Sequence, residues 1–334
     1  MKHWQLTGFG ADRLLRNESE IPTPGPHELL VRVAAVSLNY RDRLVLDGSF
    51  FPDLAFPFVP LSDAAGEVVA VGREVTRFRE GDRVVTHFFR DWIDGPVRAA
   101  EDSASVGGPL PGVLAEYILV PEHGAVATPG YLSDVEASTL PIAALTAWWA
   151  LSENKPLRPG ETVLVQGTGG VSLFALQFAS ALGARVIVTS SSEEKLARVR
   201  EMGAEATVNY ATHPEWDREV LALTGGRGFD HALEVVGGGN LRRTLNALAR
   251  GGQVSLIGFM ESRDASFDIL GFMLKFATLR PVGVGHRRSF EAMNRALEVA
   301  KIRPVIDAVY PFDDAPAALE HLDRGPFGKL VIRI

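Results

Sequence analysis

The chain has 334 residues, of which 46% are hydrophobic and 22% charged, the composition of a folded globular protein long enough for about two domains. Its formal charge of -7, from 34 basic and 41 acidic residues, argues against nucleic acid and anionic membranes as partners. The complete lack of cysteine excludes disulfides, thiolate nucleophiles and cysteine-ligated zinc or iron–sulfur centres.

The N-terminal sequence MKHWQLTGFGADR lacks the apolar stretch of a secretory signal, so the cytoplasm is the expected compartment. Residues 162–184 form the longest uncharged stretch and are long enough to test as a membrane helix. Its pattern changes at Gly167 from a continuous apolar run to a helical period, and further glycines interrupt it. The stretch is therefore predicted to be a strand, a turn and a helix, and no membrane association is expected.

Short apolar runs separated by turns occupy the first part of the chain. They lie at 29–36, 66–71, 83–88 and 115–120. The connections, among them PTPGP, VGREV and EGDRV, carry the glycine and proline that tight turns need. Residues 1–123 are therefore predicted to form a small, partly closed β structure.

Strands and helices alternate from about residue 133. The strands are expected at 163–167, 184–190, 205–210, 230–236 and 253–258. After the first strand, apolar residues recur at spacings of three and four, as on one face of a helix: Val171, Phe174, Ala175, Phe178, Ala179 and Leu182. This pattern predicts right-handed βαβ units and a doubly wound parallel sheet with helices on both faces, hence an α/β fold.

The C-terminal tail has a different pattern. A helix is expected with Phe290, Met293, Leu297 and Ala300 on its apolar face and an end at Pro304. A strand at 305–310, a helix at 315–322 and a final strand at 329–334 follow. Asp314 is the expected N-cap of the second helix.

The sequence QGTGGVS, from Gln166 to Ser172, lies between the first strand of the parallel sheet and the helix after it. Gly167, Gly169 and Ser172 match the pattern G-x-G-x-x-G/A, in which small residues allow a tight turn and close approach of a pyrophosphate. The helix N-terminus offers unpaired N–H groups to the phosphates. A dinucleotide site is therefore predicted on Gly167, Thr168, Gly169, Gly170 and Val171; the alternative is a glycine-rich turn without a ligand.

The end of the second parallel strand indicates which cofactor is used. An NAD enzyme usually has Asp or Glu there to bind the ribose 2′-hydroxyl, whereas this sequence has Ser190, followed by Ser191 and Lys195. Hydroxyl groups and an ammonium can bind a 2′-phosphate, so NADPH is predicted rather than NADH. The alternative is that Glu193 and Glu194 only complement the helix dipole and Lys195 lies on a solvated face.

Together these residues resemble the medium-chain dehydrogenase/reductase superfamily, in its zinc-independent quinone oxidoreductase-like branch. The similarity covers essentially the whole chain and rests on LNYRDRLVLDG (38–48), PFVPLSDAAGEVVAVG (57–72), GDRV (81–84), GVLAEY (112–117), LPIAALTAWWAL (140–151), the glycine turn and FGKLVI (327–332). It implies a GroES-like catalytic domain at 1–123, completed by 288–334, and an NAD(P)-binding Rossmann domain at 124–287. It also implies an active site in the interdomain cleft and a homodimer joined by edge strands near 279–285.

The resemblance adds cofactor contacts. It implies that Thr146 lies beside the nicotinamide and that Tyr210 lies near the adenosine 2′-phosphate. Val236, Gly237, Gly258 and Phe259 are expected at the C-terminal ends of later strands, where a doubly wound sheet forms its ligand crevice.

The resemblance also makes the zinc positions informative. Zinc-dependent alcohol dehydrogenases of this superfamily hold a catalytic metal at positions that correspond here to Asn39, Ser62 with Asp63, and Ile142. An amide, a hydroxyl and an alkyl chain do not make a tetrahedral zinc site. No metal is therefore expected.

Without a Lewis acid, the expected reaction is hydride transfer from NADPH to a small quinone or α,β-unsaturated carbonyl substrate, because the negative charge is then delocalised. Candidate donors to that charge are Asn39, Tyr40 and Ser62, with Arg41 as a cationic donor and Asp42 as a structural acceptor. A metal-free alcohol dehydrogenase or carbonyl reductase, and a low-turnover NADPH-binding protein, are the alternatives.

Aromatic residues raise two further points. Phe50 stands where related enoyl reductases carry a tyrosine, which argues against an enoyl-thioester reductase. The aromatic segments at 50–58 and 87–92, with Trp148 and Trp149, are either flat pocket walls or plain core.

Overall fold

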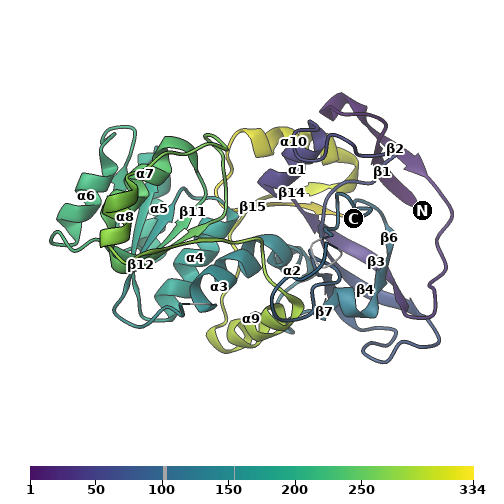
Figure 1. The fold of residues 1–334 in the computed structure, drawn as a ribbon. Coiled ribbons are helices and arrows are strands. Elements are labelled where there is room, and N and C mark those ends of the chain that lie inside the picture. Colours follow the sequence, from purple (N-terminus) through teal and green to yellow (C-terminus); the bar gives the residue numbers. More distant parts are fainter. Residues whose placement is uncertain (101–103, 154) are drawn as a thin grey trace. The chain divides into compact units, whose positions relative to one another are not determined.

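The structure is a computed structural model that describes residues 1–100, 104–153 and 155–334. It consists of two compact units, one formed by residues 1–145 and 284–334 and the other by residues 146–283 (Figure 1). Within the described residues, no helix is both long and apolar enough to cross a bilayer.

The first unit is built on antiparallel β structure. Its strands are β1 (Lys2–Leu6), β2 (Leu14–Glu18), β3 (Glu28–Ser37), β4 (Asp63–Val71), β5 (Arg83–Thr86), β6 (Tyr117–Pro121), β7 (Ala125–Ala127), β14 (Ile306–Pro311) and β15 (Lys329–Arg333). The main sheet has the order β14-β15-β3-β4-β5-β7, with β6 also paired to β3, while β1 and β2 form a separate pair. The β-rich N-terminal region is therefore confirmed, with the C-terminal strand β15 lying antiparallel to β3.

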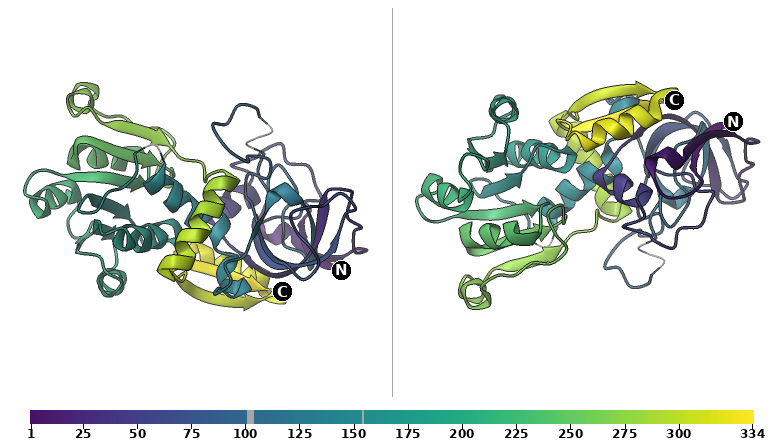
Figure 2. Two further views of the ribbon diagram at one scale, coloured as in Figure 1. Left: turned by 90° about the horizontal axis from the view of Figure 1, so that it is seen from below. Right: turned by 90° about the horizontal axis from the view of Figure 1, so that it is seen from above.

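Helices and helical turns accompany this sheet. They are α1 (Tyr40–Leu46), α2 (Asp134–Ala137), α9 (Arg287–Ala300) and α10 (Ala315–Asp323), with helical turns η1 (Ala11–Arg13), η3 (Glu122–Gly124), η4 (Leu140–Ala144) and η5 (Phe312–Asp314). Helix α10 packs on β14 and β15 (Figure 2). Helix α9 ends earlier than expected, because Lys301 adopts a left-handed conformation three residues before Pro304.

The second unit is a parallel sheet with helices. Its strands are β8 (Thr162–Gln166), β9 (Arg185–Ser190), β10 (Ala206–Asn209), β11 (Phe229–Glu234), β12 (Leu248–Leu256) and β13 (Thr278–Pro281). Its helices are α3 (Leu145–Ser152), which begins at the boundary between the units, α4 (Gly170–Ala181), α5 (Glu193–Glu201), α6 (Trp216–Leu223), α7 (Gly238–Ala247) and α8 (Ile269–Leu274). Helices lie on both faces of the sheet (Figure 2), as the sequence predicts.

The strand order of this sheet is β10-β9-β8-β11-β12-β13, with all neighbours parallel. The order reverses between β8 and β11, and in doubly wound sheets such a switch point opens the ligand crevice. The predicted doubly wound α/β fold is confirmed. The ends of β8 and β11 are therefore where a ligand crevice is expected in this unit.

Helix α4 confirms most of the apolar face predicted from the sequence, but not its C-terminal end. Phe174, Ala175, Phe178 and Ala179 are buried, as the predicted apolar face requires. Leu182 was expected to continue that face, but it is the residue after the helix and lies exposed. The expected face is therefore shorter by one residue at its C-terminal end.

The compact units and the predicted functional domains have different boundaries. Residues 124–145 lie in the first unit, where β7 pairs with β5 and extends the antiparallel sheet. The second boundary falls after Gly283, before α9. The compact units of the structure divide the chain at 145/146 and 283/284. The division into a catalytic and a cofactor-binding domain at 123/124 and 287/288 stays a prediction.

Candidate cofactor and substrate sites

The glycine turn connects β8 to α4 at the switch point of the parallel sheet. Gly167 has a φ of +73°, a conformation that favours glycine. Gly169 is the N-cap of α4 and has an ordinary φ of -80°. A Cβ atom built on either glycine meets no atom within 4 Å, so the surface above the turn is open on the side from which a phosphate would approach.

Ser172 occupies the third small position of the motif. It is buried in the first turn of α4, and its hydroxyl donates to the main-chain carbonyl of Gln166 at 2.7 Å. Glycine or alanine at this position would only pack against β8. Serine is tolerated here because its hydroxyl also forms a hydrogen bond with the end of that strand.

A buried carboxylate, which the sequence analysis missed, organises the switch point. Glu234 ends β11 with no exposed surface and accepts hydrogen bonds from Gln166 Nε2 at 3.0 Å and Thr244 Oγ1 at 2.5 Å. It also accepts from the main-chain N–H groups of Val236 and Gly237 at 2.9 and 3.0 Å. The available signal was a carboxylate after the apolar pair Ala232 and Leu233 at the end of a predicted buried strand, since a buried charge needs many bonding partners.

The predicted 2′-phosphate residues lie at the ends of β9 and β10. Ser190 and Tyr210 are neighbours, because the Tyr210 N–H donates to the Ser190 carbonyl at 3.1 Å. Ser191 is exposed, and Lys195 lies in the first turn of α5, capped by Ser192. The structure therefore brings Ser190 and Tyr210 together at one edge of the sheet, with Ser191 next in the chain and Lys195 in the first turn of the helix that follows.

Glu193 is one of the two carboxylates, with Glu194, that lie between Ser191 and Lys195 in the sequence. Its Oε1 atom accepts a hydrogen bond of 2.6 Å from Asn209 Nδ2, and Arg200 lies 3.9 Å from its other oxygen. The carboxylate is thus engaged with an amide and a guanidinium on the protein.

Other predicted cofactor residues have structural reasons for their identity. A Cβ on Gly258 would come within 2.2 Å of the Val235 carbonyl oxygen, and a Cβ on Gly237 within 2.8 Å of the Ser262 carbonyl oxygen. Both glycines are therefore required by close backbone packing, whatever they bind. The ring of Phe259 lies under the Arg263 guanidinium at 5.4 Å, and Thr146 is buried in α3.

The catalytic candidates lie in the first unit, around the start of α1. Asn39 is the N-cap residue and is 8% exposed, while Tyr40 after it is 38% exposed. The Asn39 N–H donates to Asp42 Oδ2 at 2.8 Å, so the predicted structural role of Asp42 is confirmed. This bond orders the main chain that carries Asn39 and Tyr40.

Ser62 lies next to Asp63 at the start of β4. Ser62 is fully buried and its hydroxyl donates to Asp63 Oδ1 at 2.6 Å, while the Ile142 N–H donates to Asp63 Oδ2 at 3.0 Å. The hydroxyl proton of Ser62 is therefore used in a hydrogen bond within the protein. Donation by Ser62 to a substrate stays a prediction. Asp63 therefore links Ser62 and Ile142, two of the positions compared with zinc ligands.

Lys329 joins this group, although the sequence analysis did not select it. It is 3% exposed in β15, and its Nζ atom donates to Asn39 Oδ1 at 2.6 Å and to the Leu38 carbonyl oxygen at 2.5 Å. The signal that could have found it is a lysine inside the apolar run FGKLVI, since lysine is almost never fully buried without partners.

Burial alters the acidity of all three charged residues here. It lowers the pKa of Lys329, which Asp63 and Asp42 oppose by their charges. It raises the pKa of Asp42 to about 7, although Arg41 acts in the opposite direction. It also raises the pKa of Asp63, against the effect of Lys329, the Ser62 hydroxyl and the Asn39 amide. The group is therefore a desolvated set of mutually compensating charges.

Arg41 lies at the start of α1 and binds a neighbouring loop. Its guanidinium donates to Ser105 Oγ at 3.0 Å and to the carbonyl oxygens of Val106, Gly107 and Gly108. Three aromatic rings surround it, with centroids 4.9–5.8 Å from Cζ: those of Phe50, Phe51 and Phe88. Arg41 thus fastens the 105–108 loop, and its expected role as a cationic donor to substrate stays a prediction.

The other aromatic residues also pack internally. Trp148 and Phe178 make an edge contact at 5.5 Å in the second unit.

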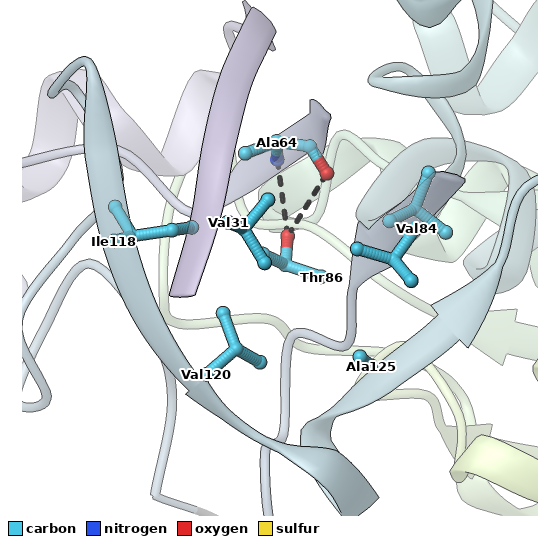
Figure 3. Close-up of a pocket in the computed structure, with 8 residues that line it drawn as sticks. Val31, Ala64, Val84, Thr86, Ile118, Val120 and Ala125 are labelled. Atoms are coloured by element: carbon cyan, nitrogen blue, oxygen red, sulfur yellow. Dashed lines mark hydrogen bonds between the residues drawn. The ribbon is translucent and has the colours of Figure 1, made fainter. Parts of the chain in front are cut away.

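Figure 3 shows a small pocket inside the antiparallel sheet, lined by Val31, Ala64, Val84, Val85, Thr86, Ile118, Val120 and Ala125. It has no room for a water molecule, and Thr86 bonds there to Ala64 N at 3.0 Å and Ser62 O at 2.9 Å. It is packed core that holds Ser62, not a substrate pocket.

Metal-binding side chains do not cluster in the described part of the chain. Over residues 1–100, 104–153 and 155–334, no group of three or more His, Cys, Asp or Glu side chains could hold an ion.

Comparison with known proteins gives consistent matches. Residues 25–130 match the family described as alcohol dehydrogenase GroES-like domain, and residues 170–299 match the family described as zinc-binding dehydrogenase. A zinc-type alcohol dehydrogenase-like protein of Schizosaccharomyces pombe is 41% identical over 99% of this chain and 98% of its own. A quinone oxidoreductase of Lama guanicoe is 29% identical over 99% and 97%. The crystal structure of a putative alcohol dehydrogenase from Sinorhizobium meliloti superposes with a TM-score of 0.95 at 48% identity, covering 100% of this chain and 98% of that one.

Proposed function

The chain belongs to the medium-chain dehydrogenase/reductase superfamily and is an oxidoreductase, and from this premise we propose that it is an NADPH-dependent, metal-free reductase of quinones or α,β-unsaturated carbonyl compounds. The observation that carries the proposal is the buried group around Asn39, in which a lysine ammonium lies 2.6 Å from the amide oxygen. Such a group can stabilise a developing oxyanion. The Lys329 ammonium already occupies the space beside the Asn39 amide oxygen, which would be the best oxygen ligand for a metal ion.

Dehydrogenases of this superfamily bind NAD(P)H, and the open glycine turn fits a dinucleotide. The space above Gly167 and Gly169 suits a pyrophosphate, and the first N–H groups of α4 point out of the helix with no earlier turn to accept them. Thr168, Gly170 and Val171 complete the turn. When bound and reduced, the nicotinamide supplies a hydride.

NADPH rather than NADH is favoured by the residues at the end of β9. Ser190 stands where a carboxylate would repel a 2′-phosphate, with Tyr210 beside it, Ser191 next in the chain and Lys195 in the first turn of α5. The nearby carboxylate of Glu193 is held by Asn209, which ties its charge to a protein donor. These features support recognition of a phosphate by hydroxyl and ammonium groups.

The donor set does not fit zinc, although the matching family is described as zinc-binding. Zinc in proteins takes thiolate, imidazole or carboxylate ligands in a tetrahedron. Here Asn39 presents an amide bonded to Lys329, Ser62 a hydroxyl, and Asp63 a carboxylate whose two oxygens already accept bonds from Ser62 and Ile142. We therefore derive the reaction without a metal.

A conjugated acceptor suits these residues better than an isolated alcohol. When hydride adds to the electron-poor carbon of an enone or quinone, the electron pair of the broken double bond moves onto a carbonyl oxygen. Hydrogen-bond donors then suffice to stabilise the charge, and solvent supplies the final proton. Asn39 and the exposed Tyr40 are the proposed donors, with Ser62 in the supporting position.

Reduction of simple carbonyl compounds is the second candidate, because relatives at 41% and 48% identity carry alcohol dehydrogenase names. NADPH oxidation followed by absorbance with a quinone, an enone and a simple aldehyde separates the two. Faster turnover of the quinone or enone supports our proposal, whereas a preference for the aldehyde supports the second candidate. Binding of NADPH without oxidation by any acceptor would indicate a binding protein and contradict both.

We also propose that the protein is a homodimer. Strand β13 is at the edge of its sheet, and an unpaired edge invites pairing with another chain. Beside it in sequence, apolar side chains of α8 and its C-terminal end are more than half exposed: Ile269, Leu270, Met273, Leu274 and Phe276. A second copy of this chain, adding its own edge strand, would cover this surface.

A further inference from the structure

Lys329 is a charged residue in an otherwise buried strand. It begins β15, where the next residues Leu330, Val331 and Ile332 are all buried. Removing an ammonium from water is strongly unfavourable unless protein groups replace its hydration. The contacts of Lys329 therefore indicate what the residue is for.

Those contacts fix the orientation of one side-chain amide. Lys329 Nζ donates to Asn39 Oδ1 at 2.6 Å and to the neighbouring Leu38 carbonyl oxygen. An ammonium has three donors and no acceptor, so the oxygen of the Asn39 amide must face it. The amide nitrogen Nδ2 is then directed away from the lysine.

The nitrogen left on the other side has no acceptor within ordinary hydrogen-bond distance. It faces Asp63 closely enough for a weak hydrogen bond that lowers the pKa of that carboxyl. An amide nitrogen carries two N–H donors, so at least one of them is left without an acceptor. Buried donors in native proteins nearly always have a partner. Nδ2 itself is covered, but Asn39 as a residue is 8% exposed and its neighbour Tyr40 38%, so the amide lies at the edge of the buried region.

We propose that Lys329 is a positioning residue that holds the Asn39 amide so that Nδ2–H donates to the carbonyl oxygen of the substrate. This inference rests on the proposed reductase function and assigns the donor within that site. As hydride adds to the conjugated carbon, the electron pair of the double bond moves to the carbonyl oxygen. Asn39 stabilises that charge and keeps its own proton, and a proton from solvent completes the product.

The ammonium also strengthens the donor. A positive charge on the amide oxygen polarises the amide, so that the N–H groups on the opposite side become better donors. Asp63 and Asp42 compensate the charge from further away. The arrangement thus supplies a fixed dipole whose direction favours negative charge on the substrate oxygen.

Two substitutions test this pairing. Asn39→Asp keeps an oxygen acceptor for Lys329 but removes the Nδ2 donor, so the fold is maintained by an ion pair. Lys329→Met keeps the length of the side chain and removes the ammonium. Asn294→Asp is the matched control, because Asn294 is also 8% exposed and buried in the same unit, with Nδ2 bonded to the Ala127 carbonyl oxygen.

The readouts are kcat and KM with NADPH and a quinone, together with thermal unfolding. For Asn39→Asp we expect kcat to fall by about 100-fold, the loss typical of an oxyanion donor, with the KM for NADPH nearly unchanged. For Lys329→Met we expect about a tenfold fall through lost orientation. The double variant should be no slower than Asn39→Asp alone, because Lys329 acts through Asn39.

The outcomes separate the inference from the function on which it rests. Wild-type turnover with full kcat in Asn39→Asp would overturn the inference and leave the reductase function standing. Additive losses in the double variant, or equal losses in Asn294→Asp, would also overturn it by showing a general structural effect. Absence of any wild-type turnover with quinone or enone would overturn the function, and the inference with it.

Discussion

The hydroxyl of Ser172 donates a 2.7 Å hydrogen bond to the main-chain carbonyl of Gln166, which fastens the first turn of α4 to the end of β8. The turn between them therefore keeps its shape without help from a ligand. That rigidity makes the glycine turn suitable for a substitution that blocks binding without disturbing folding.

Gly169→Ala is the substitution we would make there. The φ of Gly169 is ordinary and the space around it is open, so stability should change by less than about 1 kcal/mol. The added methyl group would occupy the approach of the pyrophosphate, and we expect the KM for NADPH to rise by about tenfold or more. Gly8→Ala, which meets only the Arg13 side chain at 3.7 Å, is the control. Unchanged NADPH kinetics in Gly169→Ala would contradict the cofactor site.

The double variant Ser191→Ala, Lys195→Ala tests the choice of cofactor. Loss of charge-assisted bonds to a 2′-phosphate should raise the KM for NADPH by about tenfold or more, while the KM for NADH, which lacks that phosphate, should change little. Steady-state kinetics with both cofactors measure this. Lys301→Ala, which removes a lysine paired with Glu298, serves as the control. Equal effects on the two cofactors would show that the phosphate binds elsewhere.

Metal analysis tests the metal-free reaction. We expect no stoichiometric zinc in the purified protein and no loss of quinone reduction after treatment with a chelator, because the amide, hydroxyl and engaged carboxylate around Asn39 do not fit the metal. One zinc per chain, lost together with activity on chelation, would refute the proposal.

The dimer is tested by placing charge on the exposed apolar surface beside β13. Phe276 is 81% exposed, and Phe276→Glu with Leu270→Glu should shift the protein from dimer to monomer in size-exclusion chromatography with light scattering. Val299→Glu is the control, since Val299 is equally exposed on α9 in the other unit. A wild-type monomer, or a dimer that survives both charges, would exclude this surface.

His87 should make stability depend on pH. Burial lowers the pKa of His87 to about 4, and its ring Nε2 lies 3.0 Å from the Gly285 carbonyl oxygen. The unfolded chain, with a pKa near 6.5 for histidine, binds the proton first as pH falls, so stability is lost between about pH 6.5 and 4. The contribution is about 2 to 3 kcal/mol over that range.

Urea unfolding at pH 7.5 and 4.5 measures this effect in wild type and His87→Gln. The wild type should lose about 2 kcal/mol more than the variant, and comparing the two cancels the opposite contribution of Asp42, whose pKa is raised to about 7. His213→Gln, at an exposed site, should behave as wild type. Parallel losses in wild type and His87→Gln would contradict the assignment.

Periodicity and turn residues were sufficient to predict the architecture. The parallel strands, the glycine turn and the apolar face of α4 are local patterns, because burial against a sheet fixes which residues in a short segment must be apolar. Element ends were less certain, as Leu182 and the early end of α9 show. They depend on single residues such as Lys301, which adopts a left-handed conformation that periodicity does not encode.

The sequence by itself determined the two-part α/β organisation, the dinucleotide motif, and the lack of cysteine ligands. Only the tertiary structure decided how the polar residues pair. Lys329 lies 290 positions from Asn39 along the chain, and β15 brings it there by pairing with β3. Likewise, Arg41 binds the 105–108 loop and Glu234 binds Gln166 at the end of β8. A buried charge must find its partners in space, and spacing along the chain says nothing about which ones the sheet will bring near.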